Sequence, residues 1–137
     1  MVIDEELDLK RNVLQWYPIK ENSTILQIGF ESYELIDEMC KKAEKVTLIV
    51  NNEEQKENIL QKTKYENLEI IVEQNLEKIE QEYDYISLIG TIKIYQDILE
   101  EKAYKRLQKL LKIANKICKE TGKILLTVDN KYGMKFW

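Results

Sequence analysis

Apolar and polar residues fall into alternating blocks along the chain, and these blocks predict strands separated by helices. Short apolar runs with few charges are typical of strands that are covered on both faces of a sheet. Apolar residues at helical spacing between these runs predict the helices. The expected strands cover residues 23–30, 45–50, 67–73, 83–90 and 123–130, and the expected helices cover residues 4–16, 33–45, 53–64 and 100–120.

Strands that alternate with helices favour an α/β fold with a doubly wound, mainly parallel Rossmann-like sheet. At 137 residues the chain suits one domain over residues 1–137, with an N-terminal helix within 1–18 and a core over 23–137. Gly122 follows the last helical pattern, so we expect it to cap that helix in the left-handed conformation.

The composition excludes several classes of function but does not identify one. Lys and Arg total 21 against 25 Asp and Glu, a net charge of −4, so the charges do not steer the chain to nucleic acid. Histidine is absent from the sequence. This removes the usual zinc ligand and every nucleophile–histidine pair, so we expect neither a metal site nor hydrolase chemistry of that kind.

The two cysteines and the N-terminus bear on the cellular compartment. Cys40 and Cys118 each lie in a predicted amphipathic helix, which favours buried free thiols in a reducing compartment. The N-terminus lacks the pattern of a signal peptide, and no apolar run approaches ~18 residues. We therefore expect a soluble, cytoplasmic protein without membrane contact.

Ligands of a doubly wound sheet bind beyond the carboxyl ends of the strands, where the strand order reverses. The first and fourth strands are the expected central pair. The crevice should therefore lie between the loops at residues 29–32 and 90–93, near residues 50–52 and 73–75. Ser32 is a candidate cap for the following helix. Gly29 is either part of a ligand cradle or only the glycine of a tight turn.

Five stretches along the chain resemble a known family. They are "WYPIKENSTILQIG", "AEKVTLIV", "YENLEIIV", "YDYISLIG" and "GKILLTVDNKYGMKFW". Together they are similar to class I S-adenosylmethionine-dependent methyltransferases, especially the domains found beside glycosyltransferases in some Firmicutes. The similarity covers roughly residues 16–137. It implies S-adenosylmethionine as cofactor and a small-molecule or glycan-related methyl acceptor.

The resemblance also implies where the cofactor would bind. Its glycine loop, its ribose-binding acid and its adenine contact fall at or beside seven of the eight predicted cofactor-binding positions, and the eighth, Gly90, lies in the expected crevice loop. The eight positions are Gln27, Gly29, Phe30, Glu31, Val50, Asn51, Gln74 and Gly90.

Several of these positions depart from the family pattern. Glu31 and Tyr33 replace the second and third glycines, and we expect their side chains to fill volume that the ligand needs. Val50 replaces the ribose-binding acid, with Asn51 as a partial substitute and Gln74 at the adenine position. No catalytic residue is assigned.

The family pattern continues beyond the fifth strand with a helix and an antiparallel strand pair, which we expect to be absent here. The fifth strand would then be an uncovered edge, so the chain should self-associate or pack against a further domain. Three functions stay open: a methyltransferase, a non-catalytic methyltransferase-like module that binds partners, and a generic nucleotide-binding module.

Overall fold

The computed structural model describes residues 18–92, 100–128 and 134–136. Along the chain its elements are β1 (Thr24–Ile28), α2 (Tyr33–Lys42), β2 (Lys45–Val50), α3 (Glu53–Lys62), β3 (Leu68–Val72), the single 3-10 turn η1 (Leu76–Lys78), β4 (Tyr83–Ile92), α4 (Glu100–Ile117), β5 (Cys118–Val128) and β6 (Met134–Phe136). The expected N-terminal helix over residues 4–16 lies outside the described residues.

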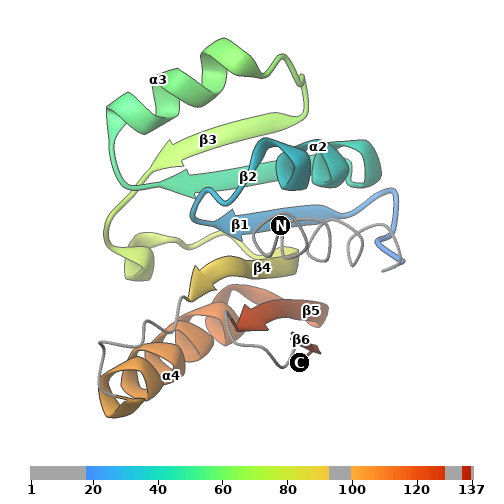
Figure 1. Cartoon of the computed structure of the whole chain (residues 1–137). Coiled ribbons are helices and arrows are strands. Elements are labelled where there is room, and N and C mark those ends of the chain that lie inside the picture. Colours follow the sequence, from blue (N-terminus) through green and yellow to red (C-terminus); the bar gives the residue numbers. More distant parts are fainter. Residues whose placement is uncertain (1–17, 93–99, 129–133, 137) are drawn as a thin grey trace, which may run out of the picture.

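All six strands form one sheet, in the order β3-β2-β1-β4-β5-β6 (Figure 1). The first five strands pair in parallel. Strand order reverses between β1 and β4. These two strands are neighbours in the sheet, although β2 and β3 lie between them in the sequence. The prediction of a doubly wound parallel sheet with this central pair is confirmed.

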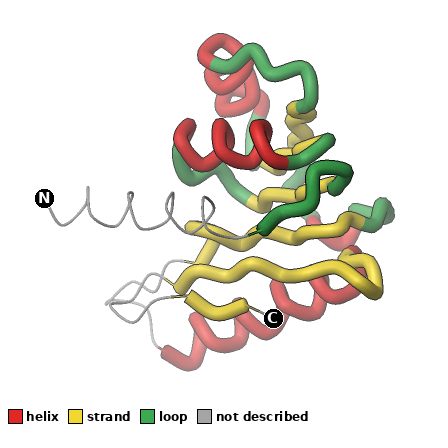
Figure 2. The backbone as a smooth tube through the Cα atoms, turned by 90° about the vertical axis from the view of Figure 1, so that its right-hand side faces the viewer, coloured by secondary structure: helices red, strands yellow, loops and turns green. Residues whose placement is uncertain are grey.

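Helices cover both faces of the sheet (Figure 2). Alternate strand residues point to opposite faces: Ile25 packs in the core cluster with α2 and α3, whereas Leu26 packs in the cluster with α4. Both residues are fully buried. This two-sided burial explains why the strands read as continuous apolar runs.

The end of α4 differs from the prediction. The helix ends at Ile117, and Gly122 lies within β5. Among the described residues, Gly29 is the glycine with positive φ, so Gly122 is not a left-handed cap. The β4–β5 register shifts between Tyr83 and Tyr85. At this irregularity the Cα of Gly122 comes so close to β4 that an added Cβ would lie 2.5 Å from the carbonyl oxygen of Asp84.

Asp84 ties three elements together near the same point. The backbone N–H of Thr24 donates to Asp84 Oδ2 at 2.8 Å, and Asp84 N–H donates to Thr24 Oγ1 at 3.1 Å. Lys119 Nζ lies 3.3 Å from Asp84 Oδ1. Asp84 therefore pairs within the fold, at the end of β4 away from the expected ligand crevice.

The expected uncovered edge of the fifth strand is partly wrong. β6 pairs antiparallel with β5 from Leu125 to Thr127. One antiparallel strand is thus present where the sequence analysis expected none. The sequence reading missed it because a strand of three residues is too short for a period-two pattern to be recognised.

Both cysteines are free thiols. Cys40 lies on the buried face of α2, and burial raises its pKa to about 12, with the nearby Asp37 carboxylate adding to the shift. Cys118 is half-buried and begins β5, so its expected place within a helix is wrong. Both thiols are free as predicted, but the expected burial is found in full for Cys40 and only in part for Cys118.

Candidate functional site

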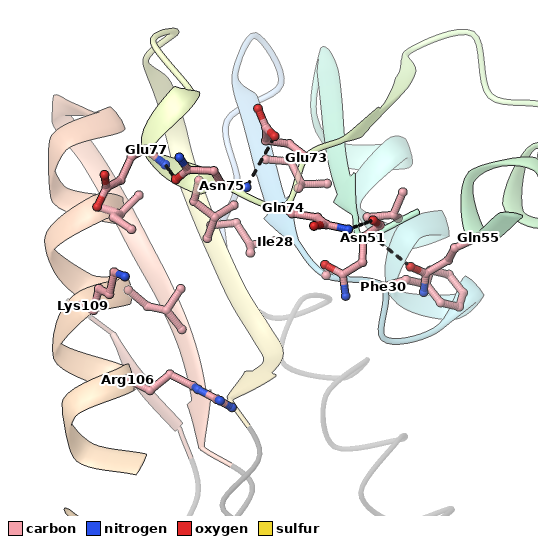
Figure 3. A pocket seen from close by; sticks show the side chains of 16 residues that line it. Ile28, Phe30, Asn51, Gln55, Glu73, Gln74, Asn75, Glu77, Arg106 and Lys109 are labelled. Atoms are coloured by element: carbon pink, nitrogen blue, oxygen red, sulfur yellow. Dashed lines mark hydrogen bonds between the residues drawn. The ribbon is translucent and has the colours of Figure 1, made fainter. Parts of the chain in front are cut away.

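A cavity of about 650 Å³ opens at the carboxyl ends of the strands, near the switch between β1 and β4 (Figure 3). Its volume lies in the range of small-molecule sites, roughly 300–1,000 Å³. The walls come from the ends of β1, β2 and β3, from η1 and from α4. They are lined by Ile28, Gly29, Phe30, Ile49, Val50, Asn51, Gln55, Glu73, Gln74, Asn75, Leu76, Glu77, Arg106, Lys109, Leu110 and Ile113.

The loop after β1 forms one wall and depends on a glycine. Gly29 has φ of 88°, a conformation that L side chains rarely adopt. Its N–H donates to Ile49 O at 2.9 Å, which fixes the loop to the end of β2. Gln27 Nε2 donates to Gly29 O at 2.9 Å from a fully buried position. The glycine therefore has a backbone role that another residue would fill only with strain.

The side chains expected to fill the ligand volume do not line this cavity. Glu31 and Tyr33 are half-buried, and neither is among the residues of its walls. Tyr33 packs edge-on against Phe30, with ring centroids 4.9 Å apart, and Lys62 Nζ lies 5.5 Å from the centre of the Tyr33 ring. Tyr33 is held away because it begins α2 and packs on the apolar core of that side.

α2 and α3 both begin beside the cavity with capped N-termini. Ser32 Oγ accepts from Leu35 N–H at 3.2 Å, as the sequence predicted. Asn52 Oδ1 accepts from Gln55 N–H at 2.8 Å, a cap that the sequence analysis did not assign. Each cap satisfies one of the free amides of a helix N-terminus and fixes the direction of the chain after the strand.

Amide side chains join the ends of β2 and β3. Gln74 Nε2 donates to Asn51 O at 3.2 Å, and Asn51 N–H faces Gln55 Oε1 at 3.5 Å. Asn51 and Gln74 are exposed, so their remaining donors and acceptors face the open cavity. This rim offers neutral hydrogen bonds where the family pattern has a carboxylate.

A carboxylate is nevertheless present, on the neighbouring strand. Glu73 follows β3, lines the cavity and accepts from Asn75 N–H at 3.4 Å. Glu77 lies on η1 and is exposed. The sequence analysis placed residues 73–75 near the crevice but assigned no role to Glu73. The sequence pattern that could have identified Glu73 is a polar residue directly after an apolar strand, since such residues lie at the ligand crevice.

The predicted positions thus divide into two groups. Five of the eight line the cavity: Gly29, Phe30, Val50, Asn51 and Gln74. Gln27 and Glu31 are not among the lining residues.

The structure gives Gly90 and Val50 roles within the sheet. Gly90 lies within β4, where the expected loop at 90–93 is wrong because β4 continues to Ile92 through a register shift between Leu88 and Ile92. A glycine inside a strand often marks such an irregularity. Val50 is 1% exposed, so its apolar side chain belongs mainly to the core.

Sequence reasoning missed the wall contributed by α4. Arg106, Lys109, Leu110 and Ile113 come from this helix, far from the strand ends in sequence. Only the path of α4 across the sheet brings them to the cavity, so no local pattern could have identified them.

Within the described ranges no cluster of cysteine and acidic side chains is suited to hold a metal ion. In that same part of the chain, no helix combines the length and apolar character that a membrane span requires.

No protein-family model and no curated protein sequence matches the chain. Solved structures do. Coclaurine N-methyltransferase bound to N-methylheliamine and S-adenosylhomocysteine is 18% identical, with a TM-score of 0.66 over 90% of this chain and 35% of its own. Ribosomal protein L11 methylase from Lactobacillus delbrueckii subsp. bulgaricus is 16% identical, with a TM-score of 0.66 over 90% of this chain and 60% of its own.

A third similar structure is the N-methyltransferase NodS from Bradyrhizobium japonicum. It is 13% identical, with a TM-score of 0.61 over 89% of this chain and 63% of its own. This chain therefore spans about a third to two thirds of the length of these proteins. At such identities the similarity concerns the fold: the chain has the Rossmann-like fold of class I S-adenosylmethionine-dependent methyltransferases.

Proposed function

We propose that the chain is a methyltransferase domain that binds S-adenosylmethionine in the cavity at the strand ends. The observation that carries the proposal is Gly29: it is held at positive φ at the switch point of a methyltransferase fold, and it lines a cavity of ligand size. A glycine in this conformation lets a ligand approach the backbone closely.

The residues of the cavity fit the chemical groups of this cofactor. The amides of Asn51 and Gln74 supply donors and acceptors for an adenine edge and ribose hydroxyls. The carboxylate of Glu73 adds a charged acceptor for hydroxyl groups. Ile28 and Phe30 offer apolar contact beside Gly29. Glu31 and Tyr33 leave this volume clear, because they do not line it.

The chain's own contribution to the reaction would be positioning. S-adenosylmethionine, when bound, supplies an electrophilic methyl group on a sulfonium. The Gly29 loop, tied to β2 through Ile49 and to Gln27 through its carbonyl, would hold the ligand in a fixed orientation. Holding reactants in line can lower the barrier of such a transfer by about 7–11 kcal/mol. No general base needs to be assigned for that role.

The proposal also covers the methyl acceptor, the cellular location and the partners of the chain. We infer a small-molecule or glycan-related acceptor, a cytoplasmic location and no nucleic-acid partner, on the resemblance and the charge balance described above. A setting beside glycosyltransferases follows from the resemblance alone.

Calorimetric titration with S-adenosylmethionine and S-adenosylhomocysteine tests the proposal. We expect one site with a Kd below about 100 μM, near −5.5 kcal/mol. Gln74→Leu should weaken binding about three- to tenfold, since one neutral hydrogen bond contributes about 0.5–1.5 kcal/mol. Gln61→Leu, the same change at an exposed position of α3 outside the cavity, should leave the Kd unchanged.

The absence of heat up to millimolar ligand, from protein that unfolds cooperatively, would refute cofactor binding. Equal effects of the two glutamine variants would refute the assignment of the cavity.

The second candidate is a non-catalytic module that packs against a partner or a further copy. Within the described residues, β6 covers β5 only along Leu125–Thr127, whereas β5 begins at Cys118. An incompletely paired edge strand offers free backbone groups to another chain. This observation supports association but does not depend on cofactor binding, so the two functions are separable by experiment.

A further inference from the structure

The crossover from β3 to β4 is unusually short for the distance it spans. The crossovers through α2, α3 and α4 contain helices of 10, 10 and 18 residues, whereas this one contains the three-residue turn η1. It must nevertheless pass β2 and β1, which separate β3 from β4. A crossover of parallel strands usually carries a helix that covers the sheet. Here η1 and α4 leave space between them on one face.

This space is the apolar part of the cavity, which we name the η1–α4 groove. Ile28 and Ile49 form its floor and are 5% and 3% exposed. Leu76 of η1 and Leu110 and Ile113 of α4 form its sides and are half-buried. All five side chains are aliphatic, so the groove suits an apolar group of a ligand.

Two cations stand on the α4 side of the groove (Figure 3). Arg106 and Lys109 are exposed, line the cavity and are three residues apart, which makes them neighbours on the helix surface. In the part of the chain that the structure describes, neither side chain forms a hydrogen bond or an ion pair. Leu110 and Ile113 continue the same stripe of the helix.

The acids of the cavity belong to a different segment. Glu73 follows β3 and already accepts a hydrogen bond from Asn75 N–H, and Glu77 lies on η1. The η1–α4 groove therefore carries two cations on its α4 side against one carboxylate, Glu77, which extends from η1 toward α4 (Figure 3). An anionic group is favoured on the α4 side, where Arg106 can bind an oxyanion through two parallel N–H donors.

We propose that the η1–α4 groove binds the methyl acceptor, and that the acceptor is a small amphipathic anion. Its apolar body lies against Leu110 and Ile113, and its carboxylate or phosphate lies at Arg106 and Lys109. Naming this ligand the acceptor rests on the proposed function, whereas the anion site itself does not. The adenosyl cofactor would occupy the other end of the same cavity, at Asn51 and Gln74.

Anilinonaphthalene sulfonate, a fluorescent molecule with an apolar body and one anionic group, is a suitable probe. We expect it to bind the native chain, with a Kd at least tenfold higher in Arg106→Gln/Lys109→Gln. The control Lys112→Gln/Lys116→Gln removes the same charge from exposed positions of α4 outside the cavity and should change the Kd less than twofold. The uncharged N-phenylnaphthylamine should bind the wild type and both variants equally.

Each titration is repeated with saturating S-adenosylhomocysteine, and cooperative thermal unfolding shows that each variant is folded. Probe affinity that is unchanged in Arg106→Gln/Lys109→Gln, or equally reduced in the control, would overturn the anion site. A loss of S-adenosylhomocysteine affinity in Arg106→Gln/Lys109→Gln would assign the cations to the cofactor and overturn the acceptor site. If the probe result holds but S-adenosylhomocysteine never binds, the anion site stands and the cofactor proposal fails.

Discussion

Gly122 offers a sharp test of the β4–β5 junction, because the sequence and the structure assign it different roles. In the structure an added Cβ would lie 2.5 Å from Asp84 O, 2.7 Å from Cys118 Sγ and 3.0 Å from Lys119 O. Carbon–oxygen contacts in proteins rarely fall below about 3.3 Å. The Asp84 contact would therefore be short by roughly 0.8 Å, a difference that the backbone must absorb.

The backbone at this point has little freedom to move. Asp84 is held by hydrogen bonds with Thr24 at 2.8 and 3.1 Å and by Lys119 at 3.3 Å. Overpacking of a site that cannot relax costs about 1–3 kcal/mol. We expect Gly122→Ala to lower the free energy of unfolding by about 2 kcal/mol, and Gly122→Asn to lower it at least as much, because its side chain is larger.

If Gly122 were a left-handed helix cap, the two variants would lose stability in the opposite order. Asparagine tolerates positive φ better than alanine does, so Gly122→Asn would then be the milder change. Gly29 provides the matched control, since its φ of 88° predicts that Gly29→Asn is milder than Gly29→Ala. Urea unfolding of the four variants measures both orders. A smaller loss for Gly122→Asn than for Gly122→Ala would refute the close-approach explanation.

Two further predictions concern charge and association. Burial opposes ionisation of Asp84, but hydrogen bonds from Thr24 and the ion pair with Lys119 outweigh it and hold its pKa below the ordinary value of 3.8. The carboxylate therefore stabilises the fold fully above its unfolded pKa, and this contribution is lost as pH falls through its folded pKa. In urea unfolding, Asp84→Asn should cost about 1–2 kcal/mol at pH 7, and its difference from wild type should shrink toward pH 3; a difference independent of pH would contradict this. In sedimentation at tens of micromolar we expect self-association through the incompletely covered β5 edge, and a clean monomer would contradict it.

The sequence alone determined the order and type of the main elements. Strands buried on both faces must be apolar at nearly every position, so residues 45–50 could be recognised with their bounds unchanged in β2. The reversal of strand order at β1 and β4 was expected because a doubly wound sheet is built outward from a central pair of strands, and the first and fourth strands fit that pair. Gly29 and Asn51 were expected at the carboxyl edge because parallel strands bring these ends to one side.

Only the tertiary structure decided what surrounds these residues. Whether Tyr33 fills the cavity depends on which face of α2 packs on the core, and Gly122 is explained by a contact with Asp84 that is distant in sequence. The α4 wall with Arg106 and Lys109 exists because a helix crosses the sheet while η1 stays short. Local patterns report the burial and the backbone preferences of neighbouring residues. Cavities are made by segments that meet only after folding, so their shape and charge lie beyond such patterns.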